Sequence, residues 1–169
     1  TQLPLVSRYY NVIIKLHGFS WEQKRYKYQN ILFNKMAKEN QNMYLVPNEQ
    51  FDIIPLYKIA DLLVSDISST LFEYLPLNRP IIQAECYTLR LKHRIFSRRF
   101  WKRLDLKRWE DVDFVYKISN PEDLFSRIYY ALENVKEMHT FRENASEYYL
   151  YKNDGGASRR LITALKDYK

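Results

Sequence analysis

Glycine and cysteine are scarce in this sequence. Glycine occurs only at Gly18, Gly155 and Gly156 among 169 residues. Dinucleotide loops of the G-x-G-x-x-G type and Walker A loops both need several glycines close together, so neither is present. The single cysteine, Cys86, excludes an internal disulfide framework and a Cys-rich zinc site, and it fits a reducing compartment.

Long hydrophobic runs and clustered metal ligands are also lacking. No stretch of 18 apolar residues occurs and no signal peptide is recognisable, so the sequence predicts no membrane-spanning helix. The histidines, His17, His93 and His139, lie far apart, and we expect neither a metal nor another cofactor. Aromatic residues are abundant (15 Tyr, 9 Phe and 3 Trp), and the length suits one domain spanning residues 1–169 with its own core.

The formal charge of +7 has a local origin. Residues 90–108, here called the basic segment, hold nine Lys or Arg and one acid, whereas the rest of the chain holds 18 bases and 19 acids. Leu, Phe and Trp alternate with these bases. The segment is a solvated helix or loop facing its own core, a contact for anionic lipid or an anionic polymer, or a nucleic-acid contact. Its candidate contact residues are Arg94, Arg98, Arg99, Lys102 and Arg103.

Short β-branched runs alternate with helical patterns along the chain. We predict strands over residues 11–16, 43–46, 62–65, 80–84 and 114–118, and helices over 21–39, 53–60, 68–75, 121–138, 140–151 and 157–168. This alternation implies parallel pairing through right-handed crossovers, hence an α/β fold with a doubly wound, mainly parallel, Rossmann-like sheet. Such sheets bind ligands where strand carboxyl ends meet helix N-termini.

Polar residues follow two of these strands. His17 comes after the first strand, where an imidazole acts as a base, holds a phosphate when protonated, or simply packs at the strand end. Asp66, Ser68, Ser69 and Thr70 follow the third strand and lead into a helix. Three hydroxyls and the helix N–H groups are a way to cradle phosphate without glycine, and ordinary N-capping by Ser68 is the alternative.

The last predicted helix begins after Asp154 and Gly155, with Ser158 at its start. Arg159 and Arg160 lie in its first turn, where cations oppose the helix dipole. A bound anion would remove this conflict, whereas the alternative is a plain turn followed by solvated arginines. The D-x-D pattern at residues 111–113 precedes a strand instead of following one, so we assign it no function.

Four segments, taken in order, resemble one known family. They are residues 13–17 ending at His17, residues 59–69 with 72–74, residues 78–82, and residues 154–158. The family is that of the CDP-glycerol glycerophosphotransferases, the bacterial teichoic-acid and capsule polymerases, and the resemblance covers roughly residues 12–165. It implies a GT-B fold of which this chain is the C-terminal, donor-binding half. We expect this isolated half to be inactive without an N-terminal half that supplies a second histidine as base.

The resemblance also implies roles for individual residues. His17 is similar to the family's catalytic histidine at the donor phosphates, and Ser68 and Ser69 to its diphosphate-contacting serines, with Asp66 and Thr70 in the same turn. Glu73 stands where the family usually has Asp, and Asp154, Gly155 and Ser158 match its late donor-binding element. Two departures are Gly18, where a Pro is usual, and Ile67, where a Tyr is usual.

The expected reaction transfers an alditol phosphate from CDP-glycerol or a related CDP-alditol to a hydroxyl of a teichoic-acid or capsular polymer, with release of CMP. The expected partners are therefore the CDP-alditol, an anionic polymer acceptor and an anionic membrane surface, and no nucleic acid. The expected location is cytoplasmic, peripheral on the inner face of the bacterial cell membrane. The alternatives are a GT-B glycosyltransferase that uses a nucleotide sugar, and a non-catalytic adaptor that binds membrane or polyanion.

Overall fold

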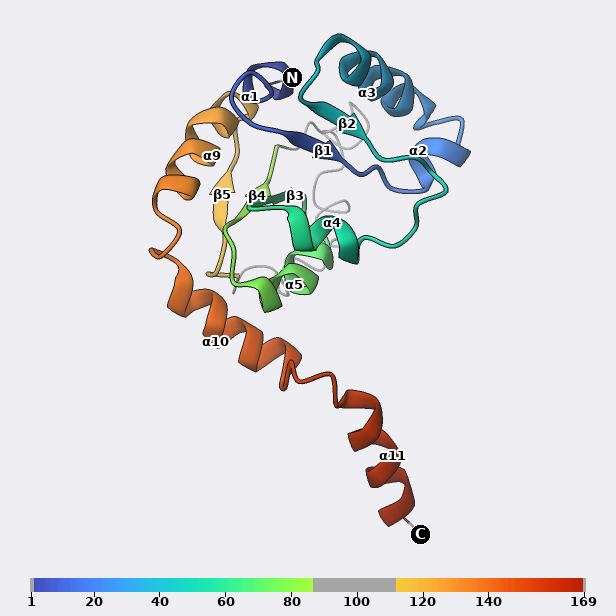
Figure 1. Cartoon of the computed structure of the whole chain (residues 1–169), viewed down its shortest axis with the longest axis vertical. Coiled ribbons are helices and arrows are strands. Elements are labelled where there is room, and N and C mark those ends of the chain that lie inside the picture. The colour runs from blue at the N-terminus through green and yellow to red at the C-terminus, as the bar shows by residue number, and fades with distance from the viewer. Residues whose placement is uncertain (1, 87–111, 169) are drawn as a thin grey trace, which may run out of the picture. The chain divides into compact units, whose positions relative to one another are not determined.

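The computed structural model describes residues 2–86 and 112–168 (Figure 1). The basic segment, with its five candidate contact residues, lies outside the described residues. The chain divides into two compact units, Thr1–Ala60 with Pro121–Ser126, and Asp61–Asn120 with Arg127–Lys169. Helices alternate with parallel strands in both, which confirms the predicted α/β class.

The first unit is built on a parallel pair of strands. β1 (Val12–Ile14) and β2 (Met43–Leu45) pair with Ile13 opposite Tyr44. They are joined through α2 (Phe19–Glu22) and α3 (Lys27–Glu39), and α3 packs against both α2 and β2 (Figure 1). α1 (Leu3–Val6) precedes β1, whereas α4 (Ile54–Ile59) follows β2 and the 3-10 helix η2 (Pro121–Asp123) comes much later in the chain.

The prediction of one helix over residues 21–39 is wrong in its first turn. The backbone at Gln23 is extended, with ψ 123°, and this ends α2. Lys24 and Arg25 that follow are exposed, so no apolar side chain at the junction can hold a continuous helix against the core. The core of this unit consists of buried Val6, Ile14, Met43, Val46 and Tyr57.

The second unit holds a three-stranded parallel sheet in the order β3-β4-β5. β3 (Leu63–Ser65) pairs with β4 (Ile81–Ala84), which pairs with β5 (Tyr116–Ile118). α5 (Thr70–Tyr74) and the 3-10 helix η1 (Leu75–Leu77) connect β3 to β4. Pro80 stands just before β4, where its missing N–H costs the ladder no hydrogen bond. The ladder hydrogen bonds thus fall into two sets, each within one unit.

Three longer helices complete the described chain, namely α9 (Leu124–Glu133), α10 (His139–Leu150) and α11 (Ala157–Asp167). The predicted helix over residues 121–138 is shorter, because it opens as η2 and ends at Glu133. Asn134, Lys136 and Glu137 beyond it are exposed polar residues that give a further turn nothing to bury. Within residues 2–86 and 112–168, the helices are too short or too polar to span a bilayer.

A buried arginine links α10 to the turn before β4. Arg142 is fully buried; its Nε donates to Asn78 Oδ1 at 2.9 Å, and its Nη2 donates to Asn78 O at 3.3 Å and to Val135 O at 2.7 Å. Asn78 adopts a left-handed conformation with φ 47°. The arginine therefore acts as a clamp on a strained turn. Phe72 and Tyr149 of α10 also make a tilted ring contact, with centroids 4.7 Å apart.

Candidate functional site

His17 follows β1 and is exposed to solvent. The backbone N–H of Phe19 donates to His17 Nδ1 at 3.1 Å, and the two rings meet edge to face with centroids 4.5 Å apart. Because Nδ1 accepts this bond, the neutral imidazole carries its proton on Nε2. His17 is therefore arranged to present an N–H donor to a ligand, as a group that holds a phosphoryl oxygen must.

The loop that carries His17 is tied to two helices. Ser20 N donates to His17 O at 2.9 Å as α2 begins, and the buried Ser20 Oγ donates to Gln29 Oε1 of α3 at 2.7 Å. Gly18, between them, has φ −50°, within the range of proline, and a Cβ built there meets nothing within 4 Å. A proline, the residue usual in the family at this position, is therefore compatible with the φ of Gly18.

The serine loop (residues 65–70) follows β3 in the second unit. Ser69 occupies the N-cap position of α5, with αR backbone angles and no side-chain cap, so the alternative of N-capping by Ser68 is wrong. Ser68 Oγ lies 3.5 Å from Thr70 N, a long contact. Thr70 Oγ1 instead shares a 2.9 Å hydrogen bond with Ser65 Oγ, so the Thr70 hydroxyl is tied back to the strand end. Asp66 lies exposed in the same turn.

Ser69 is joined to Glu73 one helical turn later. Ser69 Oγ donates to Glu73 Oε1 at 3.1 Å, and both residues are exposed. The carboxylate thus accepts the hydroxyl proton that a phosphate would need. Anion binding at Ser69 requires the hydroxyl to rotate away from Glu73, so Glu73 competes with a bound phosphate both for this donor and through its charge.

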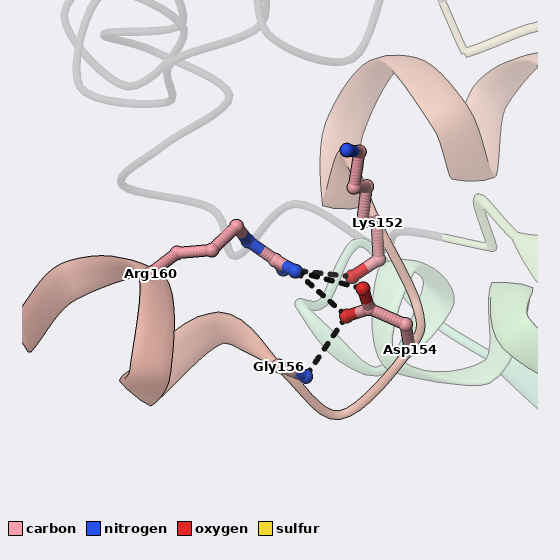
Figure 2. A network of polar contacts seen from close by, with 4 residues as sticks. All are labelled: Lys152, Asp154, Gly156 and Arg160. Atoms are coloured by element: carbon pink, nitrogen blue, oxygen red, sulfur yellow. Dashed lines mark hydrogen bonds and ion pairs between the residues drawn. The ribbon is translucent and has the colours of Figure 1, made fainter. Parts of the chain in front are cut away.

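Asp154 closes the turn before α11 (Figure 2). Asp154 Oδ1 accepts from Gly156 N at 2.8 Å and from Arg160 Nη1 at 2.8 Å, while Arg160 Nη2 donates to Lys152 O at 3.3 Å. The Arg160 hydrogen bond, followed by that of Gly156, lowers the pKa of the Asp154 carboxyl. Gly155 supplies the left-handed backbone of this turn with φ +69°.

The Asp154–Arg160 ion pair bears on whether Arg160, at the start of α11, needs a bound anion beside it. Arg160 lies in the first turn of α11, where its charge opposes the helix dipole, and Asp154 neutralises it. A bound anion is therefore not needed to explain Arg160. Ser158 is exposed at the start of the same helix. Donor binding by Asp154, Gly155 and Ser158 stays a prediction.

His17 and the serine loop thus stand at the carboxyl ends of parallel strands, His17 after β1 of the first unit and the loop after β3 of the second. Sequence reasoning missed three residues that position them: Phe19 through its backbone, Gln29 and Ser65. Only Ser65 left a signal, as a fourth hydroxyl at the end of the third strand. Over residues 2–86 and 112–168, no group of three His, Cys, Asp or Glu side chains could hold a metal ion.

The chain was also compared with models of known protein families. Residues 6–166 match the model of the family described as CDP-Glycerol:Poly(glycerophosphate) glycerophosphotransferase. The chain belongs to this family, which confirms the resemblance seen in the sequence. No curated protein and no solved structure matches the chain.

Proposed function

We propose that this chain is the donor-binding part of an enzyme that transfers an alditol phosphate from CDP-glycerol, or a related CDP-alditol, to a hydroxyl of a teichoic-acid or capsular polymer. The observation that carries the proposal is the family match over residues 6–166, within which His17 and the serine loop each stand at a strand end. Parallel α/β sheets bind phosphorylated ligands at the carboxyl ends of their strands.

In the proposed reaction, the acceptor hydroxyl oxygen attacks the phosphorus that bears the alditol. A new P–O bond forms, the bond to the CMP phosphate breaks, and CMP leaves with the electron pair. Negative charge then spreads over the phosphoryl oxygens and the leaving CMP, and positioned donors stabilise it. The proton of the acceptor hydroxyl passes to a base, which we assign to the N-terminal half implied by the family resemblance.

His17 serves this reaction as a hydrogen-bond donor. Its Nδ1 is occupied by Phe19 N–H, so Nε2–H is the group directed to a phosphoryl oxygen. Glutamine places an amide nitrogen close to the position of Nε2, whereas alanine removes the donor. We expect His17→Gln to keep part of the affinity for CDP-glycerol and His17→Ala to lose more, as measured by calorimetry.

The serine loop is tested by the binding of CDP to the full chain. We expect the double variant S68A/S69A to bind about tenfold or more weakly, because each lost hydrogen bond to a charged phosphate contributes roughly 1.5–3 kcal/mol before solvent screening. The matched control is S119A/S126A, which removes two exposed serine hydroxyls outside the serine loop. Equal CDP affinity in both double variants would refute the assignment of the serine loop to phosphate.

Two alternatives are resolved by further measurements. A donor screen with CDP-glycerol, CDP-ribitol and UDP-sugars separates a glycerophosphotransferase from a GT-B glycosyltransferase. We also propose peripheral binding to the inner face of the membrane, with Arg98, Arg99, Lys102 and Arg103 among the contacts to anionic lipid. Unchanged binding to phosphatidylglycerol vesicles after these four become Ser would discard the lipid contact, and binding of polymer or vesicles without any CDP-alditol binding would indicate an adaptor.

A further inference from the structure

One surface of the first unit lies outside the site described above. The α3 lysine stripe consists of Lys27, Asn30, Asn34, Lys35 and Lys38, which share one side of α3 at helical spacing. Together with Ile31 and Glu39 they line an open hollow of about 640 Å³.

The charges of the stripe are available to a ligand. The one ion pair described for its lysines joins Lys35 to Glu39 at 3.8 Å, with side chains 72% and 59% exposed. Such a long, exposed pair holds its partners weakly. Lys27 and Lys38 have no carboxylate partner among the residues that the structure describes. Three ammonium groups therefore face solvent along one helix, and Glu39, the one acid of the hollow, follows them at the end of α3.

The amide side chains of the stripe add neutral donors. Asn34 Nδ2 donates to Asn30 O at 3.1 Å and also to Asn30 Oδ1. Because Asn30 Oδ1 is an acceptor in this contact, the Asn30 NH₂ group is left as a donor for a ligand. Ammonium and amide donors in alternation suit phosphate oxygens. An interfacial lipid helix would instead need a broad apolar face, whereas of the exposed apolar residues of α3 (Tyr28, Ile31 and Leu32) only Ile31 lines the hollow.

The stripe is also connected to the catalytic histidine. α3 packs against α2, and Gln29, near the N-terminal end of α3, accepts the hydrogen bond from Ser20 of α2, whose backbone N–H donates to His17 O. Lys27, at the same end of α3, is therefore the end of the stripe nearer to His17. From Lys27 to Lys38 the stripe runs about 16 Å at about 1.5 Å per residue, long enough for more than one repeat of a glycerol phosphate polymer.

We propose that the α3 lysine stripe binds the phosphodiester backbone of the growing polymer and directs its terminal hydroxyl toward His17. The inference rests on the proposed function for the identity of the polymer, since the family description names poly(glycerophosphate). It assigns an acceptor surface to a chain in which we relate the family's motifs to binding of the donor alone. The stripe binds the acceptor through charge and hydrogen bonds, so its affinity falls steeply as salt rises.

The test measures the binding of delipidated poly(glycerol phosphate) to the full chain by calorimetry at low and physiological salt. The variant K27Q/K35Q/K38Q removes the three charges of the stripe. The matched control K117Q/K136Q/K166Q removes three exposed lysine charges from the second unit. We expect the stripe variant to bind about tenfold more weakly, with a shallower salt dependence, and the control to stay within about twofold of wild type.

Further measurements distinguish a loss of acceptor binding from a loss of folding, of donor binding or of lipid binding. K27R/K35R/K38R keeps the charge and retains polymer binding, and CDP-glycerol affinity is unchanged in the stripe variant. An equal loss in stripe and control variants, no loss in the stripe variant, or no polymer binding by wild type would overturn the proposal. A loss of binding to phosphatidylglycerol vesicles with unchanged binding to the polymer would also overturn it. A stripe-specific loss in a chain that binds no CDP-glycerol would uphold the acceptor surface and refute the proposed donor.

Discussion

The clamp between Arg142 and Asn78 allows a prediction with a worked magnitude. Asn78 holds a left-handed φ of 47°, and Arg142 reaches it from α10 with two hydrogen bonds. Asn78→Ala removes the bond from Arg142 Nε to the side chain, which costs about 1.5–3 kcal/mol for a charged donor. It also places alanine in the left-handed region, at a further cost of about 1 kcal/mol.

Asn78→Gly makes the same deletion of the side chain but tolerates the left-handed backbone. We therefore expect Asn78→Gly to destabilise the fold by about 1.5–3 kcal/mol and Asn78→Ala by about 1 kcal/mol more. Arg142→Met keeps much of the volume and removes three hydrogen bonds, yet it also removes a buried cation without a carboxylate partner among the described residues. Its expected cost is about 2–4 kcal/mol.

The assay is urea denaturation of each variant followed by circular dichroism. The double variant N78G/R142M completes a thermodynamic cycle, in which we expect a coupling of about 1–2 kcal/mol because both single changes delete the same bond. Additive single effects would show that the clamp contributes nothing as a unit. Equal costs for Asn78→Gly and Asn78→Ala would show that the left-handed backbone is not the constraint we infer.

Three further predictions concern backbone conformation and pH. Gly18→Pro should fold with α2 intact and gain about 0.4–1 kcal/mol in urea denaturation, because φ is already −50°; loss of α2 would contradict this. Burial raises the pKa of Tyr74 from 10.0 to about 12, so its stabilising contribution is complete below pH 10.0 and is lost as pH rises toward about 12. Tyr74→Phe should reduce the alkaline loss of stability, with a remainder due to Tyr116, because burial also raises the pKa of Tyr116 to about 12. An unchanged profile would exclude Tyr74 as a source of the loss. Arg160 lowers the pKa of Asp154, so the turn before α11 is stabilised above the ordinary carboxyl range and loosens on acidification through the lowered pKa. Faster amide exchange in α11 at acid pH, absent from Asp154→Asn, is the expected signature, and acid-sensitive exchange that persists in this variant would argue against it.

Local patterns were enough to predict most elements. β-branched runs placed all five described strands, and the alternation with helices predicted parallel pairing, because both depend on residues close together in the chain. The positions of His17 and the serine loop at strand ends followed from the same reading. The prediction of one continuous helix over residues 21–39 was wrong, because helical spacing alone does not detect a break where the side chains have nothing to pack against.

The contacts that set the chemistry of these residues needed the tertiary structure. The Ser69–Glu73 bond and the Asp154–Arg160 pair join neighbours, yet their formation depends on rotamers and turn geometry that residue types do not specify. Arg142 and Asn78 lie 64 residues apart, and no local signal connects them. By itself, therefore, the sequence determined the family, the strands and the polar residues that follow them. Only the tertiary structure decided which hydrogen-bond donors are occupied, which charges are neutralised and how the strands divide between two sheets. The reason is that hydrogen bonds and ion pairs depend on the distance between groups in space and not on their separation along the chain.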